Sequence, residues 1–347
     1  MRTASLRKSC VPLSLRRLQM PARAQIMAAM YTAQRPSRCE TLPLRGIDYH
    51  VRRWGPDSAD SALPPLVLAH GWMDVAASYQ FAVDAFSADF FAGRTIIAAD
   101  WRGFGLTRPK APVDHYQFVD YLADLDLLLD HYAPGQAVDL VGHSMGGNVA
   151  MLYAGARPAR IRRLVNLEGF GLAPTAASEA PARYAKWLDE TRALARGELD
   201  LKSYDSLEGV AQRLRKTNRR LGADKALWLA QHWAAADAQG RWHILGDAAH
   251  KVVSPHLFRV EEVLAVYAAI TAPTLAVEAS DDSLAQWNQG RYTLAQYHAR
   301  LGQVRDCRTA RVDDAGHMLH HDQPEAVARL IEDFLAKPVP AAGPAQA

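Results

Sequence analysis

The residues most able to do chemistry form the sequence Gly-His-Ser-Met-Gly-Gly at positions 142–147. This segment directly follows an apolar run, VDLV, and directly precedes a helical run, NVAMLYAGA. A serine at such a junction lies on a strained strand-to-helix turn, and the glycines two residues away on either side leave the turn room. The amino end of the following helix favours negative charge that develops beside the serine. The pattern predicts that Ser144 is a nucleophile.

A serine needs a base within hydrogen-bond reach before it can attack. Of the thirteen histidines, His317 is the best placed, because its segment VDDAGHMLHHDQPE lies between the last expected strand and the last expected helix. This placement gives the chain order serine, acid, histidine. His320 and His321 are the fallback bases, and we expect them to be solvated residues of a first helical turn.

The base in turn needs a carboxylate that orients the imidazole and stabilises its charged form. Asp282 follows the expected strand TLAVEA in the turn SDDS and is the first candidate. Asp281 is one residue away, and a one-residue error in the length of the strand would exchange the two. Glu168 ends a neighbouring expected strand, LVNLE, and is the third candidate. Geometry has to decide among them.

An oxyanion is stabilised by two backbone amides, one of which follows the nucleophile. That amide belongs to Met145. The segment His-Gly-Trp at 70–72 ends an early strand, LVLA, and offers the amide of Trp72 as the second donor. We expect His70 itself to serve as a structural hydrogen-bonding residue.

Hydrophobic periodicity indicates an α/β protein whose mostly parallel central sheet is covered by helices on both faces. Helical stripes are expected over 115–132 and 323–336. The expected strands are Ile47–Trp54, Leu66–His70, Thr95–Asp100, Val138–Gly142, Leu164–Glu168, Thr274–Glu278 and a segment near Val304–Val312.

Between residues 171 and 272 the alternation of strands and helices stops, and helical patterns rich in aromatic residues take its place. We interpret this segment as a helical lid inserted into a core formed by 40–170 and 273–336. The lid and its surroundings predict an apolar substrate pocket. Its expected lining residues are Trp72, Phe170, Trp187, Trp228 and Trp233.

Composition limits the function classes. Residues 1–39 hold eight Lys and Arg and no acidic residue, so the other 308 residues hold 32 basic against 37 acidic groups. The body therefore shows no basic stripe, and we expect no nucleic-acid partner. We interpret 1–39 as a basic disordered leader and 337–347 as a disordered tail. Whether the leader is a targeting segment, and the oligomeric state, are left open.

The chain has no run of 18 apolar residues, and we expect no stable membrane insertion. The three cysteines, Cys10, Cys39 and Cys307, are odd in number and far apart. They fit neither a disulfide framework nor a zinc site, which favours a reducing compartment and a cytoplasmic location. Neither a Gly-rich phosphate loop nor a cluster with metal-ligand spacing is present, so we expect no cofactor and no metal.

Four motifs in order resemble the α/β-hydrolase superfamily, and within it the capped branch of epoxide hydrolases, dehalogenases, carbon–carbon bond hydrolases and serine esterases. The motifs are HGW at 70–72, DWRGFG at 100–105, GHSMGG at 142–147 and DAGHMLHHDQPE at 314–325. The resemblance covers about residues 40–336. It implies that Ser144, Asp282 and His317 form a triad and that the amides of Trp72 and Met145 form an oxyanion hole.

The resemblance also implies that Asp100 and Arg102 support the loop beside the site. Some relatives carry the acid after the earlier strand, which keeps Glu168 open. Epoxide hydrolases and dehalogenases have an aspartate where this chain has Ser144, which argues against both chemistries.

We therefore expect a serine hydrolase that cleaves a hydrophobic carboxylic ester through an acyl-enzyme. The alternatives are carbon–carbon bond hydrolysis of a diketone-type acid by the same triad, and a non-catalytic ligand-binding protein of the same fold. The first alternative would need a lid arginine for the carboxylate of its substrate, and Arg183, Arg213 and Arg220 are available.

Overall fold

A computed structural model describes residues 8–9, 30–57, 61 and 63–337 of the chain. The tail 338–347 and most of the leader 1–39 lie outside the described residues, so the expectations that fall on them are not addressed by the structure.

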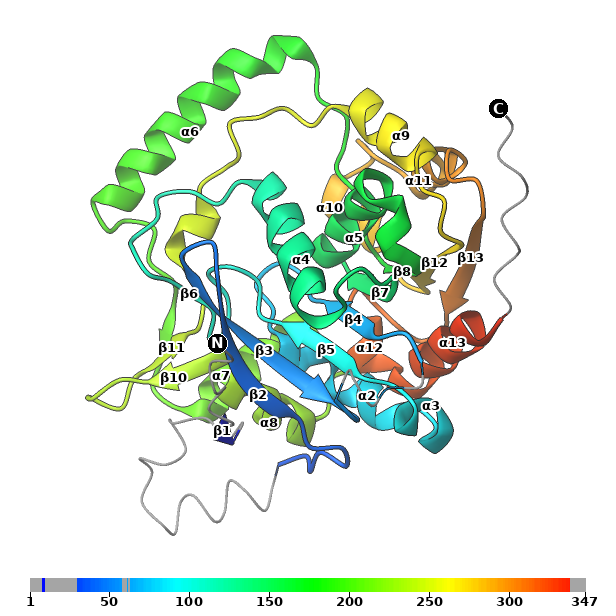
Figure 1. The fold of residues 1–347 in the computed structure, drawn as a ribbon. Coiled ribbons are helices and arrows are strands. Elements are labelled where there is room, and N and C mark those ends of the chain that lie inside the picture. The colour runs from blue at the N-terminus through cyan, green and yellow to red at the C-terminus, as the bar shows by residue number, and fades with distance from the viewer. Residues whose placement is uncertain (1–7, 10–29, 58–60, 62, 338–347) are drawn as a thin grey trace.

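A mostly parallel sheet forms the centre of the molecule (Figure 1). Its order is β1-β2-β3-β5-β4-β7-β8-β12-β13, with β6 paired to β3. The neighbours from β5 to β13 run parallel, whereas β1, β2 and β3 are antiparallel additions at one edge. The strands are β1 (Lys8–Ser9), β2 (Arg38–Leu44), β3 (Ile47–Trp54), β4 (Leu66–Ala69), β5 (Ile96–Ala99), β6 (Arg108–Pro109), β7 (Val138–His143), β8 (Ile161–Leu167), β12 (Thr274–Ala279) and β13 (Cys307–Val312).

Two apolar cores, one on each face of the sheet, hold the helices in place. Tyr121, Val149 and Tyr267 belong to the core under α4 (Phe118–Tyr132), α5 (Met145–Ala156), α9 (Val260–Ala268) and α11 (Leu294–Leu301). Val83 and Ile331 belong to the core under α2 (Gln80–Ala85), α12 (Leu319–Asp322) and α13 (Pro324–Ala336). Strands β4 and β5 are buried at every residue, as strands covered on both faces must be. The expected fold class is confirmed.

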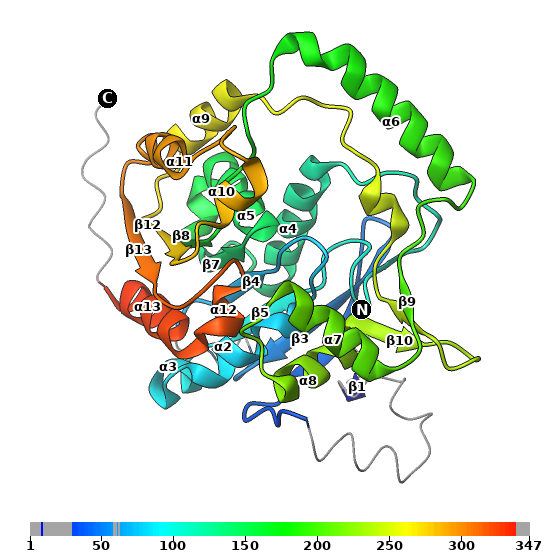
Figure 2. The same cartoon turned by 180° about the vertical axis from the view of Figure 1, so that it is seen from behind.

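The segment between β8 and β12 forms a cap beside the core (Figures 1 and 2). Most of its elements are helices, and it also contains a small antiparallel sheet of order β10-β11-β9 that the sequence analysis did not expect. Helix α9 packs on α5 and belongs to the core, since a Cβ on Gly155 would lie 2.1 Å from the carbonyl oxygen of Val266. The cap elements are η5 (Ala177–Glu179), α6 (Ala180–Ala195), β9 (Ser203–Tyr204), α7 (Leu207–Thr217), α8 (Ala223–Trp233), β10 (Ala234–Ala236), β11 (Trp242–Ile244) and η6 (Ala248–Lys251).

Residues 30–39, which the sequence analysis placed with the leader, are packed against the cap and the core. Met30 is buried, and the ring of Tyr31 makes edge contacts with Phe81 of α2 and Trp228 of α8. The hydroxyl of Tyr31 donates to Asp84 at 2.7 Å. This segment therefore joins α8 to the core.

The cysteine expectation is wrong at one residue, because Cys39 is disulfide-bonded. Cys307 is free and half-buried. A disulfide-bonded cysteine does not favour a reducing compartment, and the cytoplasmic location remains a prediction. Among the described residues, no helix has both the length and the apolar character needed to cross a membrane.

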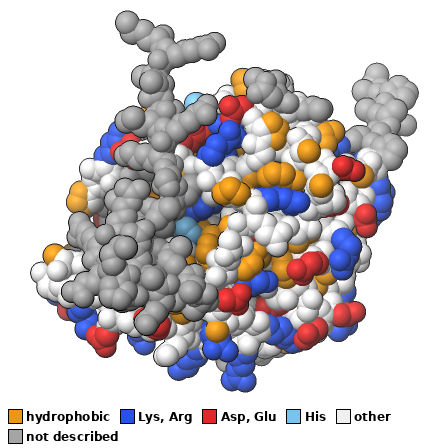
Figure 3. All heavy atoms as spheres, turned by 90° about the horizontal axis from the view of Figure 1, so that it is seen from below, with side chains coloured by type: hydrophobic (Ala, Val, Ile, Leu, Met, Phe, Trp, Pro, Cys, Tyr) orange, Lys and Arg blue, Asp and Glu red, His pale blue; other side chains and the backbone are white. Residues whose placement is uncertain are grey.

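The face seen from below carries charges of both signs, interspersed with apolar side chains (Figure 3). Grey atoms cover part of it. On the visible part, basic side chains do not gather into a stripe of the kind that nucleic-acid binding uses.

The remaining short elements complete the core. They are η3 (Ala76–Tyr79), α3 (Ala88–Ala92), η4 (Pro158–Arg160) and α10 (Ser283–Asn288).

Candidate active site

Ser144 lies between β7 and α5 on a backbone that L-residues rarely adopt, with φ 51° and ψ −116°. The two glycines of the motif make this turn possible. A Cβ on Gly142 would lie 2.3 Å from the carbonyl oxygen of Gly146, and a Cβ on Gly146 would lie 2.1 Å from that of Ala69. Neither space admits a side chain. The strain is of a kind concentrated at functional sites, and it costs about 1–3 kcal/mol per residue.

His317 contacts a carboxylate. Its Nδ1 lies 3.1 Å from Oε2 of Glu168, whose side chain is 1% exposed. Glu168 directly follows β8, has a φ of 56°, and accepts the amide of Ala279 at 2.8 Å through Oε1. When Nδ1 carries the proton and donates it to Glu168, the lone pair of His317 lies on Nε2. That tautomer is the one a general base needs.

The first candidate for the acid does not make this contact. Asp282 caps helix α10 and accepts the amide of Ala285 at 2.8 Å. Asp281 is bound by the guanidinium of Arg220, with 2.7 Å between Nη1 and Oδ2. The chain turns into α10 directly after β12, and this turn directs Asp282 to the amino end of its own helix. The structure therefore corrects the order of the candidates and places Glu168 against His317.

The loop 70–73 runs beside the nucleophile, since a Cβ on Gly71 would lie 3.2 Å from the Cβ of Ser144. His70 holds this loop as a structural residue. Its Nε2 accepts the amide of Trp101 at 2.8 Å, and its Nδ1 therefore donates to the carbonyl of Gly71 at 2.8 Å. The sequence analysis assigned His70 this role.

The two amides predicted to form the oxyanion hole come from different elements, one from the first residue of a helix and the other from the loop 70–73. Met145 is the first residue of α5, and an amide at that position has no acceptor within its own helix. The amide of Trp72 donates no hydrogen bond to any described residue. Neither amide therefore has a hydrogen-bond acceptor among the described residues.

Two residues that the sequence analysis did not select contact His317. Nε2 of His143 donates to the carbonyl oxygen of His317 at 2.7 Å and so holds its loop. The indole of Trp287 meets the imidazole edge-on, with 4.1 Å between ring centroids, and is 52% exposed. His143 could have been suspected because it precedes Ser144. Nothing in the sequence around Trp287 points to the site.

Asp100 and Arg102 support the neighbouring loop, as the resemblance implied. Asp100 accepts the amides of Ala76 and Leu106, and Arg102 forms a bidentate pair with the buried Asp124. By contrast, His320 and His321 are wrongly expected to be solvated, because both are buried.

The aromatic residues predicted to line a pocket are dispersed. Phe170 and Trp228 are buried in separate apolar clusters, and Trp187 lies against His115. Trp72 belongs to the loop 70–73 beside Ser144 and is 54% exposed. Trp233 alone of the five lines a crevice, which is too narrow to admit a water molecule. The other residues lining this crevice are Met73, Asp74, Val75, Phe104, Ile244 and Leu245.

Burial shifts the pKa of both members of the pair. It raises the pKa of Glu168 to about 7, although the amide of Ala279 and the hydroxyl of Ser283 act in the opposite direction. It lowers the pKa of His317 to about 3. At neutral pH the imidazole is therefore uncharged and able to accept a proton.

Comparison with known proteins shows the family. A family model described as the alpha/beta hydrolase fold matches residues 64–324. The chain belongs to the alpha/beta-hydrolase family. The hydrolase is 24% identical to a serine hydrolase-like protein of Danio rerio over 296 residues, which cover 81% of this chain and 83% of the relative. It is 29% identical to a putative carbamate hydrolase of Variovorax paradoxus over 250 residues, which cover 71% and 83% of the two chains.

Solved structures agree on the fold. A hypothetical protein of Pseudomonas aeruginosa superposes with a TM-score of 0.72 at 26% identity, covering 86% of the hydrolase and 98% of that chain. A thioesterase domain from the curacin biosynthetic pathway superposes with a TM-score of 0.70 at 21% identity, and the match covers 85% of the hydrolase and 99% of that domain.

Substitution distinguishes the candidate acids of the hydrolase. We expect Glu168→Gln to lower kcat on an activated aryl ester by about 10²–10⁴, because an amide does not stabilise the charged imidazole and can hold the wrong tautomer. Asp282→Asn also removes one carboxylate charge, after β12, the strand next to the one that Glu168 follows. It should change kcat by less than about threefold, because Asp282 does not contact His317. Steady-state kinetics on both folded variants measure this. Equal losses, or a larger loss in Asp282→Asn, would contradict the assignment.

The pKa values also predict a pH dependence. At low pH the Glu168–His317 pair holds two protons, one on Nδ1 of His317 and one on the carboxyl group of Glu168. The second proton leaves as the pH rises through about 7, the pKa of Glu168, and the base is active only after it has left. We therefore expect kcat/KM to fall about tenfold for each pH unit below that value and to level off above it. The measurement is a kcat/KM profile from pH 5 to 9 in buffers of constant ionic strength. A flat profile would show that the pair does not limit activity.

Proposed function

We propose that this hydrolase cleaves hydrophobic carboxylic esters through an acyl-enzyme formed on Ser144. The observation that carries the proposal is the hydrogen bond between Glu168 and His317, on the loop that His143 holds beside the strained serine turn. These parts supply a nucleophile, a base and an acid that orients the base, as acyl transfer requires.

In the first half of the reaction, Oγ of Ser144 attacks the carbonyl carbon of the ester while its proton passes to Nε2 of His317. The carboxylate of Glu168 stabilises the imidazolium that forms. The carbonyl oxygen becomes an oxyanion and accepts hydrogen bonds from the amides of Trp72 and Met145. Losing one such donor costs about 10²–10³ in rate.

The tetrahedral intermediate then collapses. The bond to the alcohol oxygen breaks, and His317 returns its proton to that oxygen. Water attacks the acyl-enzyme in the second half, again with His317 as base, and the carboxylic acid leaves as the serine regains its proton. Each step uses only residues of the site described above.

Apolar surroundings support a hydrophobic substrate. A crevice too narrow for a water molecule begins at Met73, in the loop 70–73 beside Ser144, and most of the side chains that line it, among them Phe104 and Leu245, are apolar. The exposed indoles of Trp72 and Trp287 add apolar surface next to the serine and the histidine. Such surfaces bind acyl or aryl groups by removing apolar area from water.

The contacts of one lid arginine support ester hydrolysis over carbon–carbon bond hydrolysis. Arg220, one of the lid arginines available for a substrate carboxylate, is engaged by Asp281 and Asp314. Two relatives are named a serine hydrolase-like protein and a putative carbamate hydrolase, and a carbamate, like an ester, is hydrolysed at a carbonyl group.

A fluorophosphonate probe tests the proposal. We expect about one label per chain, mapped to Ser144 by peptide mass spectrometry, because the probe reacts with activated serines. Ser144→Ala should take up none, and Ser178→Ala, in an exposed part of the cap, should label like the wild type. The kcat/KM for p-nitrophenyl esters should then rise with acyl chain length from acetate.

Absence of labelling on folded protein would overturn the proposal in favour of a ligand-binding protein of the same fold. A rate that falls steadily with chain length would overturn the hydrophobic substrate class while leaving the serine mechanism in place.

A further inference from the structure

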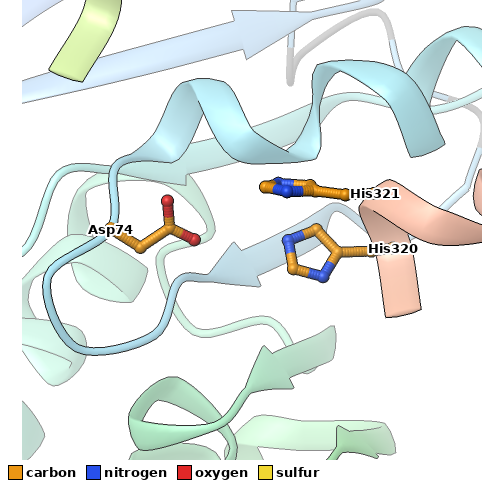
Figure 4. Close-up of side chains that lie close together, drawn as sticks. All are labelled: Asp74, His320 and His321. Atoms are coloured by element: carbon orange, nitrogen blue, oxygen red, sulfur yellow. The ribbon is translucent and has the colours of Figure 1, made fainter. Parts of the chain in front are cut away.

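A second cluster of chemically competent side chains lies behind the active site. Asp74 comes from the loop that follows His-Gly-Trp, and His320 and His321 are consecutive residues of α12. One ligand atom of each lies within 4.8 Å of the other two. The carboxylate and the two rings face a common space (Figure 4).

All three residues are buried, and His320 is fully so. Both ring nitrogens of His320 and Oδ2 of Asp74 lack any hydrogen-bond partner in the described part of the chain. A buried polar atom without a partner costs about 1–3 kcal/mol. Three such atoms in one place leave the cluster able to bind a ligand.

Other atoms of Asp74 and His321 form hydrogen bonds within the protein, and these bonds orient the remaining oxygen and nitrogen atoms of the cluster. Oδ1 of Asp74 accepts the hydroxyl of Ser78 and, at 3.1 Å, the indole of Trp233. Since Ser78 donates its proton to Asp74, its oxygen accepts from Nε2 of His321 at 3.1 Å. His321 thus keeps the lone pair on Nδ1, and Asp74 keeps Oδ2. Outer hydrogen bonds of this type set the tautomer and ring orientation of metal ligands.

We propose that Asp74, His320 and His321 bind a divalent transition metal ion, with Zn²⁺ as the best match. Two imidazoles and one carboxylate are a common zinc ligand set, whereas Mg²⁺ and Ca²⁺ favour oxygen ligands. Zinc–ligand bonds of about 2.0–2.2 Å require ligand atoms roughly 3.3 Å apart, so the side chains close inward when the ion binds. A water molecule can supply the fourth ligand.

The site is separate from the triad, and the proposed hydrolysis does not use it. Its ligands nevertheless border the catalytic residues. The ring of His320 lies against that of His143, with 4.4 Å between centroids and 55° between the ring planes, and His143 holds the loop of His317. The ion therefore links α12 to Asp74, which directly follows the loop 70–73 that carries Trp72. No metal was expected because no cluster in the sequence has metal-ligand spacing, and Asp74 lies about 250 residues from the two histidines.

Zinc binding can be measured without reference to activity. The full-length protein is stripped with a chelator and dialysed, then titrated with ZnCl₂ by calorimetry, and the metal retained after desalting is counted by mass spectrometry. We expect about one zinc per chain and a melting temperature that rises with zinc concentration, because the ion binds the folded state.

Three variants test the assignment. Asp74→Asn keeps an oxygen for Ser78 and Trp233 but replaces the free oxygen, and His320→Gln removes a ligand from α12. Each should weaken zinc binding by about 10²-fold or more, because loss of an outer-shell partner alone costs about 10–100-fold. The matched control, His243→Gln, alters an exposed histidine that pairs with Asp237 and should bind like the wild type.

Circular dichroism of the metal-free proteins verifies folding, and His321→Gln replaces either variant that fails to fold. A wild-type protein that retains no zinc overturns the proposal. Unchanged affinity in folded Asp74→Asn and His320→Gln, with zinc still bound, shows that the ion binds elsewhere and overturns it equally.

Discussion

The turn at Ser144 depends on close approach between backbones. Strand β7, helix α5 and the end of β4 come so near each other that a methyl group on Gly142 or Gly146 would overlap a carbonyl oxygen. This contact is possible only when the parallel strands are paired in register and α5 is pressed onto the sheet by the core beneath it. The packing of the whole α/β core therefore holds the serine in a conformation that it would not adopt alone.

The same sheet brings the rest of the site to its carboxyl edge. Strands β7, β8 and β12 are parallel neighbours, so the residues that follow them emerge together. Ser144 follows β7, and Glu168 follows β8. The loop after β13 brings His317 back across this edge, where Glu168 and His143 hold its ring and its carbonyl. Burial removes water from these contacts, which keeps the imidazole uncharged and strengthens each hydrogen bond.

The fold and the serine could be predicted from the sequence because their signals are local. Continuous apolar runs mark buried parallel strands, and glycine spacing marks the turn. The acid could not be chosen, since Asp282 and Glu168 both follow strands that end at one edge, and only the direction of the chain after β12 separates them.

Contacts between distant segments were missed for a similar reason. Trp287 and the pairing of Asp74 with α12 join parts of the chain that no periodicity connects. The pocket aromatics were misplaced because a tryptophan packed in a helical cluster and one facing a substrate have the same spacing.

A crystal structure of the protein phosphonylated at Ser144 tests the central claim most directly. We predict the phosphoryl oxygen within hydrogen-bond distance of the amides of Trp72 and Met145, with Nδ1 of His317 still bonded to Glu168. A histidine bonded instead to Asp282 would contradict the account.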